Sequence, residues 1–178
     1  MIDLSGLATY PTIVSDLDPM RSILRTACHE WIHAYFFFRS LGQGIYDSDD
    51  MWTLNESAAD LAGRELGDLV FASIGGDLTD SARQFLLSEE RDPFFTSYLR
   101  ETQRDVRELL DNDKVEEAEQ YMKERWWQLR LGGYRLRKLN QAFFAFHEVY
   151  ASSPASISPI GDELEELRGL QPGLGPFI

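Results

Sequence analysis

Residues 26–35 read TACHEWIHAY. On an α-helix, His29 and His33 stand four positions apart, so both imidazoles project from one face and can bind the same tetrahedral metal ion. Glu30 follows His29 directly, which places its carboxylate beside the coordination position that the two histidines leave open. This H-E-x-x-H pattern predicts a helix that carries a catalytic zinc ion. The alternative is a helix whose two histidines share a face and bind no metal.

A catalytic zinc site needs a third protein ligand, because such sites take three ligands and leave the fourth position to water or substrate. Residues 55–60 read NESAAD near the start of the next expected helix, and Glu56 can complete a His₂Glu site. Asp60 lies one turn after Glu56 on the same face, where its carboxylate can accept the N–H of a ligating imidazole and fix its tautomer. The alternative for Glu56 is a first-turn glutamate favoured by the helix dipole.

The two motifs together resemble those of the gluzincin metallopeptidases, in which H-E-x-x-H is followed further along the chain by N-E-x-x-A-D. The resemblance implies a zincin-like helical catalytic domain that hydrolyses peptide bonds. It implies that His29, His33 and Glu56 are the ligands of one Zn²⁺ ion. It also implies that Glu30 is the general base and that Asp60 is the hydrogen-bond partner of a ligating histidine.

A looser resemblance concerns residues 139–146, which read LNQAFFAF and are followed by Tyr150. They are similar to the L-N-N-A…Y segment of bacterial putative aminopeptidases with short helical catalytic domains, although Gln141 stands where that segment has Asn. Gluzincins supply a Tyr or His from a later helix as the donor to the oxyanion. The resemblance implies Tyr150 for this role, with His147 as the second candidate and Asn140 as a candidate substrate contact. Otherwise Tyr150 ends a core helix and bonds a nearby carbonyl.

Composition sets the outer bounds of the interpretation. A chain of 178 residues that is 43% hydrophobic and 12% aromatic is typical of one globular domain, which we expect to span residues 1–178. The net charge of −13 argues against a nucleic acid partner, because neutralising phosphates requires clustered Lys and Arg. The single cysteine, Cys28, cannot form an internal disulfide. No apolar run approaches the ~20 residues that a membrane-spanning helix needs.

Residues 7–14 read LATYPTIV and predict one strand. A proline suits an edge strand because it donates nothing to a ladder, and in zincin-like enzymes an edge strand pairs with the extended substrate. Tyr10 in this segment is therefore a candidate substrate contact. Because no other strand of this quality follows, we expect the chain to be the catalytic portion of a longer protein. The alternative is a natural start with a disordered arm.

The remaining pattern predicts helices throughout. The helix with the zinc motif is expected to begin near Pro19 and to end at Leu41-Gly42, and the all-apolar residues 35–38 predict that it is buried. Capping residues and apolar spacing predict five further segments: a helix from about Met51 or Thr53 to Ser73, a short helix from Thr79 or Asp80 to about Glu90, a helical hairpin from residues 94–110 and 115–131, a helix over 136–150, and a short helix over 162–170.

The only basic cluster falls on the hairpin and on the segment after it. Two interpretations stay open, an anchor for a substrate carboxylate or a simple offset to the neighbouring acidic helix. Its members are Lys123, Arg125, Arg130, Arg135, Arg137 and Lys138.

The sequence therefore predicts a mainly α-helical, single-domain zinc peptidase that acts on a peptide or protein substrate. A metal-bound water would attack the scissile carbonyl, with Glu30 taking its proton. One alternative is a non-catalytic zinc-stabilised binding or sensory domain, and another is a helical interaction module without a metal. Endopeptidase and aminopeptidase action both stay open, as do the compartment and the oligomeric state.

Overall fold

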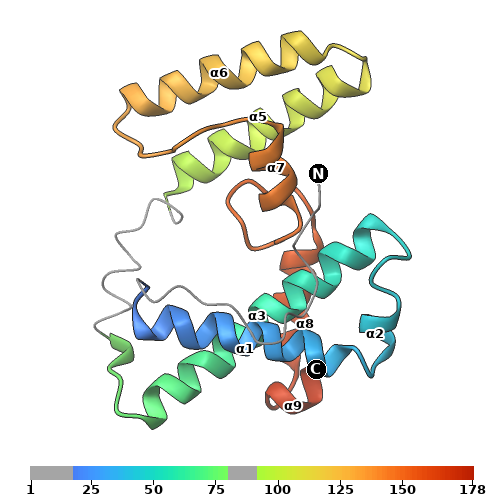
Figure 1. Ribbon diagram of the computed structural model, residues 1–178, viewed down its shortest axis with the longest axis vertical. Coiled ribbons are helices and arrows are strands. Elements are labelled where there is room, and N and C mark those ends of the chain that lie inside the picture. The colour runs from blue at the N-terminus through green and yellow to red at the C-terminus, as the bar shows by residue number, and fades with distance from the viewer. Residues whose placement is uncertain (1–17, 80–91) are drawn as a thin grey trace. The chain divides into compact units, whose positions relative to one another are not determined.

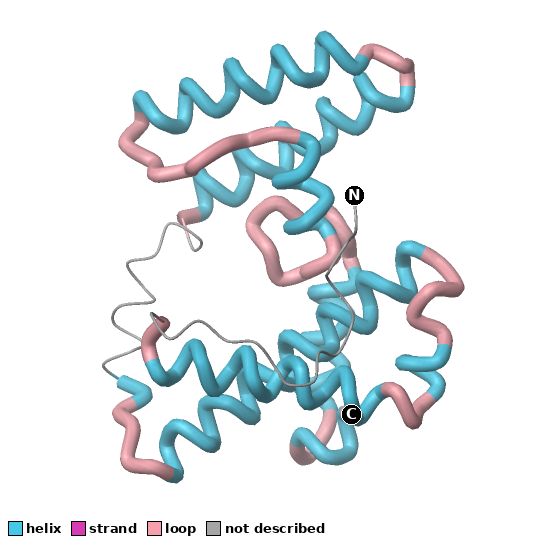
Figure 2. The backbone as a smooth tube through the Cα atoms, viewed as in Figure 1, coloured by secondary structure: helices cyan, strands magenta, loops and turns pink. Residues whose placement is uncertain are grey.

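The computed structural model describes residues 18–79 and 92–178, and every regular element within these ranges is a helix (Figures 1 and 2). The mainly α prediction is confirmed. The strand expected at residues 7–14, with Tyr10, lies outside the described residues, as does nearly all of the short helix expected to end near Glu90. None of the described helices combines the length and the apolar character needed to cross a bilayer.

The chain, for which a single domain is expected, divides into two compact units. Unit 1 comprises Met1–Phe85 and Pro159–Ile178, and unit 2 comprises Leu86–Ser158. Unit 1 holds α1 (Met20–Phe36), α2 (Ser40–Gln43), α3 (Asp49–Ser73), α8 (Ile160–Leu170) and α9 (Leu174–Phe177). Its buried core is made by Ile32, Phe36, Ala58, Ala59, Ala62 and Leu164, which α1, α3 and α8 contribute.

The helix α1 ends earlier than predicted, at Phe36 rather than near Gly42. The backbone tightens there, because Phe38 N–H donates to Tyr35 O and Arg39 N–H donates to Phe36 O, and α2 then starts separately at Ser40. The prediction that the run 35–38 is buried is wrong for two of its members. Phe36 faces the core, whereas Phe37 and Phe38 are 69% and 78% exposed, because α1 packs through only one face in unit 1.

The helix α3 begins at Asp49, slightly before the predicted start. The Ser48 side chain accepts a hydrogen bond from Met51 N at 3.1 Å, which satisfies one of the unpaired N–H groups of the first turn. Asp49 and Asp50 lie in that turn, where the helix dipole favours negative charge. The cap therefore fixes where the helix carrying Glu56 begins.

The helices α1 and α3 cross at very close range, because α3 presents glycine at the crossing. A Cβ atom added to Gly63 would lie 2.7 Å from His29 Cα, and one added to Gly67 would lie 2.6 Å from Arg25 Cα. Neither contact is compatible with a side chain at these positions. The Asp68 carboxylate closes the crossing, since it accepts hydrogen bonds from the guanidinium groups of both Arg21 and Arg25 at 2.6–2.7 Å.

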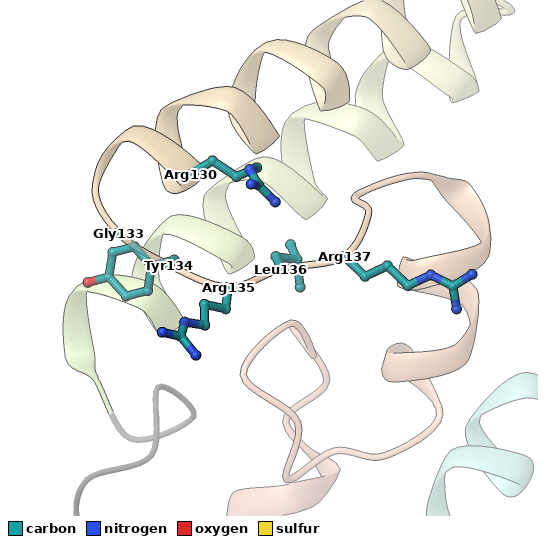
Figure 3. A pocket seen from close by; sticks show the side chains of 6 residues that line it. All are labelled: Arg130, Gly133, Tyr134, Arg135, Leu136 and Arg137. Atoms are coloured by element: carbon teal, nitrogen blue, oxygen red, sulfur yellow. The ribbon is translucent and has the colours of Figure 1, made fainter.

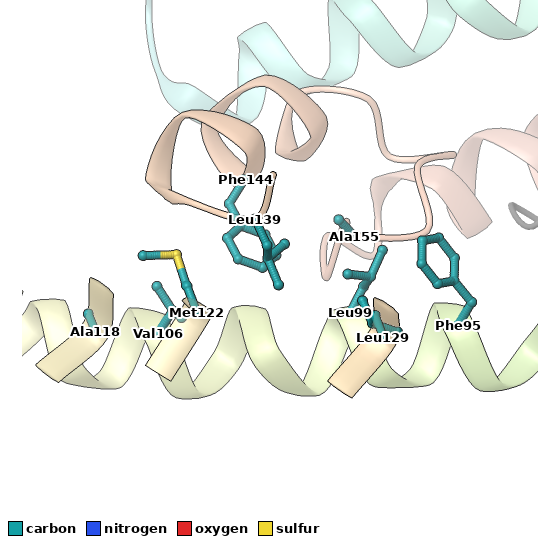
Figure 4. Packing of buried hydrophobic residues seen from close by; sticks show 9 residues of the cluster. All are labelled: Phe95, Leu99, Val106, Ala118, Met122, Leu129, Leu139, Phe144 and Ala155. Atoms are coloured by element: carbon teal, nitrogen blue, oxygen red, sulfur yellow. The ribbon is translucent and has the colours of Figure 1, made fainter. Parts of the chain in front are cut away.

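Unit 2 contains the predicted hairpin, formed by α5 (Pro93–Asp111) and α6 (Val115–Leu131), which lie side by side in Figure 1. Asp92 caps α5 by accepting from Phe94 N, and Asp113 makes the turn with a φ of 57°. Figure 4 shows the core between the two helices and the segment that follows them. The buried members of this core are Phe95, Leu99, Val106, Ala118, Met122, Leu129, Leu139, Phe144 and Ala155.

The last predicted helix of unit 2 is much shorter than expected. The sequence predicts a helix over 136–150, but α7 spans only Gln141–Glu148. Two contacts explain the late start. The Leu136 carbonyl accepts a hydrogen bond from Trp126 Nε1 at 2.9 Å, and Asn140 caps the helix by accepting from Phe143 N at 3.0 Å. Residues 134–140 therefore form a non-helical connection anchored to α6.

Candidate metal centre

Three side chains of unit 1 converge on one point, His29 and His33 from α1 and Glu56 from α3. The two histidine Nε2 atoms lie 3.0 Å apart, and each lies 3.5 Å from Glu56 Oε2. Within the described residues, these three form the only group of His, Cys, Asp or Glu side chains close enough together to hold a metal ion. The spacing of four residues on α1 accounts for the imidazole pair, and the crossing with α3 adds the carboxylate.

The separations fit a tetrahedral zinc ion. With bonds of about 2.0–2.2 Å, such an ion holds its ligand atoms about 3.3–3.6 Å apart. The observed triangle of 3.0, 3.5 and 3.5 Å differs from that by a few tenths of an ångström at most. Two imidazole nitrogens and one carboxylate oxygen are a donor set that zinc uses in catalytic sites, with the fourth position left to water. The residues present therefore fit one Zn²⁺ ion.

The burial of the carboxylate supports the same conclusion. The Glu56 side chain is 0% exposed, and neither of its oxygens has a hydrogen-bond donor among the described residues. A buried carboxylate without such partners is costly unless another positive charge compensates it. The side chains of His33 and His29 that face it are themselves only 5% and 15% exposed. A bound cation would supply the compensation.

The charged side chains of the site shift the pKa values of Glu56 and His29. Burial by itself raises the pKa of Glu56, but His29 and His33 outweigh it and lower the pKa to about 2. Burial by itself lowers the pKa of His29, but Glu56, Asp60 and Glu30 raise it above its ordinary value. The carboxylate of Glu56 is thus ionised at neutral pH, as a metal ligand must be.

Three residues that the sequence analysis did not single out hold the candidate ligands in place. The glycines at 63 and 67 allow the close crossing, and Gly63 meets the backbone of His29 itself. Asn55, beside Glu56, is 1% exposed and donates from Nδ2 to Leu41 O at 3.1 Å, which fixes the start of α3 against the segment after α1. The spacing of Gly63 and Gly67 by four residues was the sequence signal for a close helix contact.

The other predicted residues of unit 1 lie near the triangle. Glu30 is partly exposed on α1, and its charge reaches His29, whose pKa it helps to raise. Asp60 acts on His29 in the same direction. Its Oδ2 atom also lies 3.1 Å from Arg64 Nη2, an ion pair that sequence reasoning did not foresee. The roles of Glu30 as base and of Asp60 as a histidine partner stay predictions.

The remaining candidates belong to unit 2. Asn140 caps α7 through its side chain, which gives it a structural task besides the predicted substrate contact. His147 Nδ1 lies 3.3 Å from Ser153 Oγ, and the ring packs 4.2 Å from that of Phe143. Tyr150 follows the end of α7 and lies 5.8 Å from the ring of Phe146. Their roles at the oxyanion and in substrate binding stay predictions.

Comparisons of the chain with protein-family models, with curated proteins and with solved structures gave no match. The function is therefore inferred from the chemistry of the residues. The His29, His33 and Glu56 triangle is the feature with the most specific chemistry.

Proposed function

We propose that this protein is a zinc-dependent peptidase. The observation that carries the proposal is the triangle of His29 Nε2, His33 Nε2 and Glu56 Oε2, with separations of 3.0, 3.5 and 3.5 Å. Its dimensions suit a tetrahedral ion with one open position, and Glu30 follows the first ligand on the same helix. The resemblance to the gluzincin motifs agrees with this donor set.

Each residue has a defined task in the proposed reaction. When bound, the zinc ion would polarise the scissile carbonyl and lower the pKa of a water molecule to about 7. His29, His33 and Glu56 would hold the ion through their two imidazole nitrogens and one carboxylate oxygen. The Glu30 carboxylate accepts the proton of the attacking water at one oxygen and returns it to the nitrogen of the leaving amine. Glu30 is partly exposed and is not needed as a ligand, so its carboxylate stays available for this transfer.

The proposal is tested by measuring zinc content and hydrolysis together. Purified protein should bind one zinc ion and cleave members of a mixed peptide library. Glu30→Gln should keep the zinc while lowering turnover by about 10²–10⁴-fold, the usual contribution of a general base. Glu166→Gln on the exposed side of α8 removes the same charge away from the site and should leave both unchanged.

Three outcomes would contradict the proposal. Full hydrolysis by zinc-loaded Glu30→Gln would exclude this general base. Stoichiometric zinc without any peptide hydrolysis would instead support the alternative of a non-catalytic zinc-stabilised binding or sensory domain, in which the ion only ties α1 to α3. Absence of zinc after reconstitution would contradict both and would favour a helical module without a metal.

A further inference from the structure

The end of α1 carries two aromatic side chains that stay out of the core of unit 1. Phe37 and Phe38 are 69% and 78% exposed, and their rings meet edge to face with centroids 5.2 Å apart. Large apolar side chains that lie together in water are unfavourable there, and such a surface marks a place where another molecule binds. These two residues form the aromatic pair.

The helical register places Phe37 on the face of α1 that carries the candidate metal centre. Its N–H donates to His33 O at 3.0 Å, and its φ of −52° and ψ of −32° are helical, so the spiral of α1 continues through it. At 3.6 residues per turn, Phe37 lies about 40° around the axis from His33 and about 20° from Glu30. It stands about 6 Å further along the axis than His33, which is roughly one turn.

The surface of α1 between Glu30 and the aromatic pair is small and open. Ala34 lies one turn after Glu30 and is exposed. Its methyl group leaves room for a bound chain to run along the helix toward Phe37. The step of about 6 Å from His33 to Phe37 equals about two residues of an extended peptide at ~3.3 Å each. A peptide cut at the candidate centre would therefore bring a side chain next to the cut bond within reach of Phe37.

The backbone around the aromatic pair is held in place. Arg39 N–H donates to Phe36 O at 2.8 Å, which closes the turn that contains Phe38. The buried Asn55 side chain donates from Nδ2 to Leu41 O at 3.1 Å, which ties the segment after the pair to α3. The two rings are thus presented by a fixed backbone, and this lowers the entropic cost of binding.

The hollow of about 450 Å³ at the end of α6 in unit 2 offers no comparable arrangement (Figure 3). Its three arginines are exposed, and their head groups extend to different sides, so they do not meet at one ligand. The hollow therefore gives no support to an anchor for a substrate carboxylate in the basic cluster. Its lining residues are Arg130, Gly133, Tyr134, Arg135, Leu136 and Arg137.

We propose that the aromatic pair determines the specificity of the candidate active site by binding an apolar side chain next to the bond that is cut. This inference rests on the proposed peptidase function. The substrate class is a peptide with an aromatic or aliphatic residue at that position, because its contact with Phe37 removes apolar surface of both from water. A carboxylate side chain would lose hydration against the two rings without gaining a partner.

The test uses the zinc-loaded full chain and two probes, N-acetylglycine hydroxamate and N-acetylphenylalanine hydroxamate. Both bind an open zinc ion through the same hydroxamate group, and they differ only in a benzyl group. Isothermal titration calorimetry measures their affinities without any hydrolysis. We expect the phenylalanine probe to bind about tenfold or more tightly than the glycine probe, because its ring is buried against the aromatic pair.

Phe37→Ser should remove most of this preference and leave the affinity of the glycine probe unchanged. The matched control is Leu69→Ser, which removes another exposed apolar side chain of unit 1 about 20 Å along α3 from Glu56. It should leave both affinities unchanged. Cleavage of a mixed peptide library should show the same preference for an apolar residue next to the cut bond, and Phe37→Ser should abolish it.

Failure of this inference differs from failure of the proposed function. If the glycine probe binds but the phenylalanine probe binds no tighter, or if Phe37→Ser keeps the preference, the aromatic pair does not select substrates and the peptidase proposal stands. If the chain takes up no zinc, or neither probe binds to the zinc-loaded chain, both are overturned. A dimer that Phe37→Ser dissociates in sedimentation would show that a second copy covers the pair, which would overturn this inference alone.

Discussion

Glu56→Gln tests the proposed metal centre most directly, because it removes the one anionic side chain among the three candidate ligands and keeps the size of the side chain. Zinc sites with four ligands bind with about 10–16 kcal/mol, or roughly 3–4 kcal/mol per ligand. Since about 1.4 kcal/mol corresponds to a factor of ten, losing this ligand should weaken zinc binding about 10²–10³-fold. Neither oxygen of the carboxylate has a hydrogen-bond donor among the described residues, and the two imidazoles 3.5 Å away are its ion-pair partners, so no other contact confuses the result.

The expected effect on thermal unfolding follows from this loss of zinc affinity of about 10²–10³-fold. Zinc at 100 times its Kd stabilises the folded protein by about 2.7 kcal/mol. For a domain of roughly 60–100 residues this corresponds to a rise in Tm of about 10–20 °C. At the same zinc concentration, zinc should stabilise the folded Glu56→Gln protein by only about 0.4 kcal/mol or less, which raises its Tm by at most about 3 °C.

The assay follows helical circular dichroism during heating, with and without zinc, and compares the zinc-dependent rise for each protein. Taking this difference removes any effect of the substitution on the metal-free protein. Glu30→Gln carries the same charge change but affects no ligand, so it should keep the full rise. The reasoning would be refuted if zinc stabilised Glu56→Gln as strongly as the unaltered protein, or if it stabilised neither.

Three further predictions concern the surroundings of the site. Gly63→Ala should lower the free energy of unfolding in urea by about 1–3 kcal/mol and weaken zinc binding, because the added Cβ would press on His29. The control is Gly169→Ala, which has open space around the added Cβ and should stabilise α8 slightly. Asp60→Ala should weaken zinc binding or activity about 10- to 100-fold without loss of helix. An unchanged zinc affinity, measured by competition with a chelator, together with unchanged activity would show that Asp60 does not support a ligating histidine. Partial burial by itself raises the pKa of Asp68, but Arg21 and Arg25 outweigh it and hold this pKa well below its usual range. The ion pairs of Asp68 therefore stabilise the folded protein at any pH above the unfolded pKa of about 3.9. This stabilisation is lost as the pH falls through the lower folded pKa. Urea midpoints between pH 2 and 7 should show this dependence, and Asp68→Asn should reduce it.

The grouping of His29, His33 and Glu56 was predictable because their chemistry and their spacing depend on local geometry. His29 and His33 share a face of any helix that includes both of them. Glu56 lies in the motif N-E-x-x-A-D, whose glutamate is the natural third member of a group with two histidines. The hairpin was predictable for a similar reason, since the apolar periodicity and the Asp92-Pro93 start are local signals. These features need no knowledge of which elements pack together.

The errors arose where distant contacts decide the local structure. The apolar character of Phe37 and Phe38 predicted burial, but only one face of α1 packs in unit 1, so both stay exposed. The start of α7 depends on the bond from Trp126 to the Leu136 carbonyl, which spans ten residues and leaves no periodic signal. The division into two units could not be read from composition, because both units are helical and similarly apolar.

The order of the two units along the chain has a consequence for synthesis. Unit 2 is inserted into unit 1, and the bidentate pair between Glu65 of α3 and Arg168 of α8 joins residues 103 positions apart. At about 5–20 residues per second, a ribosome needs roughly 5–20 s to reach the second partner after the first. During that interval α1 and α3 are already made while α8, which contributes Leu164 to their core, is not. Unit 2 can therefore complete its fold on the nascent chain before unit 1 does, while the apolar surface of α1 and α3 that Leu164 covers stays open until α8 is made.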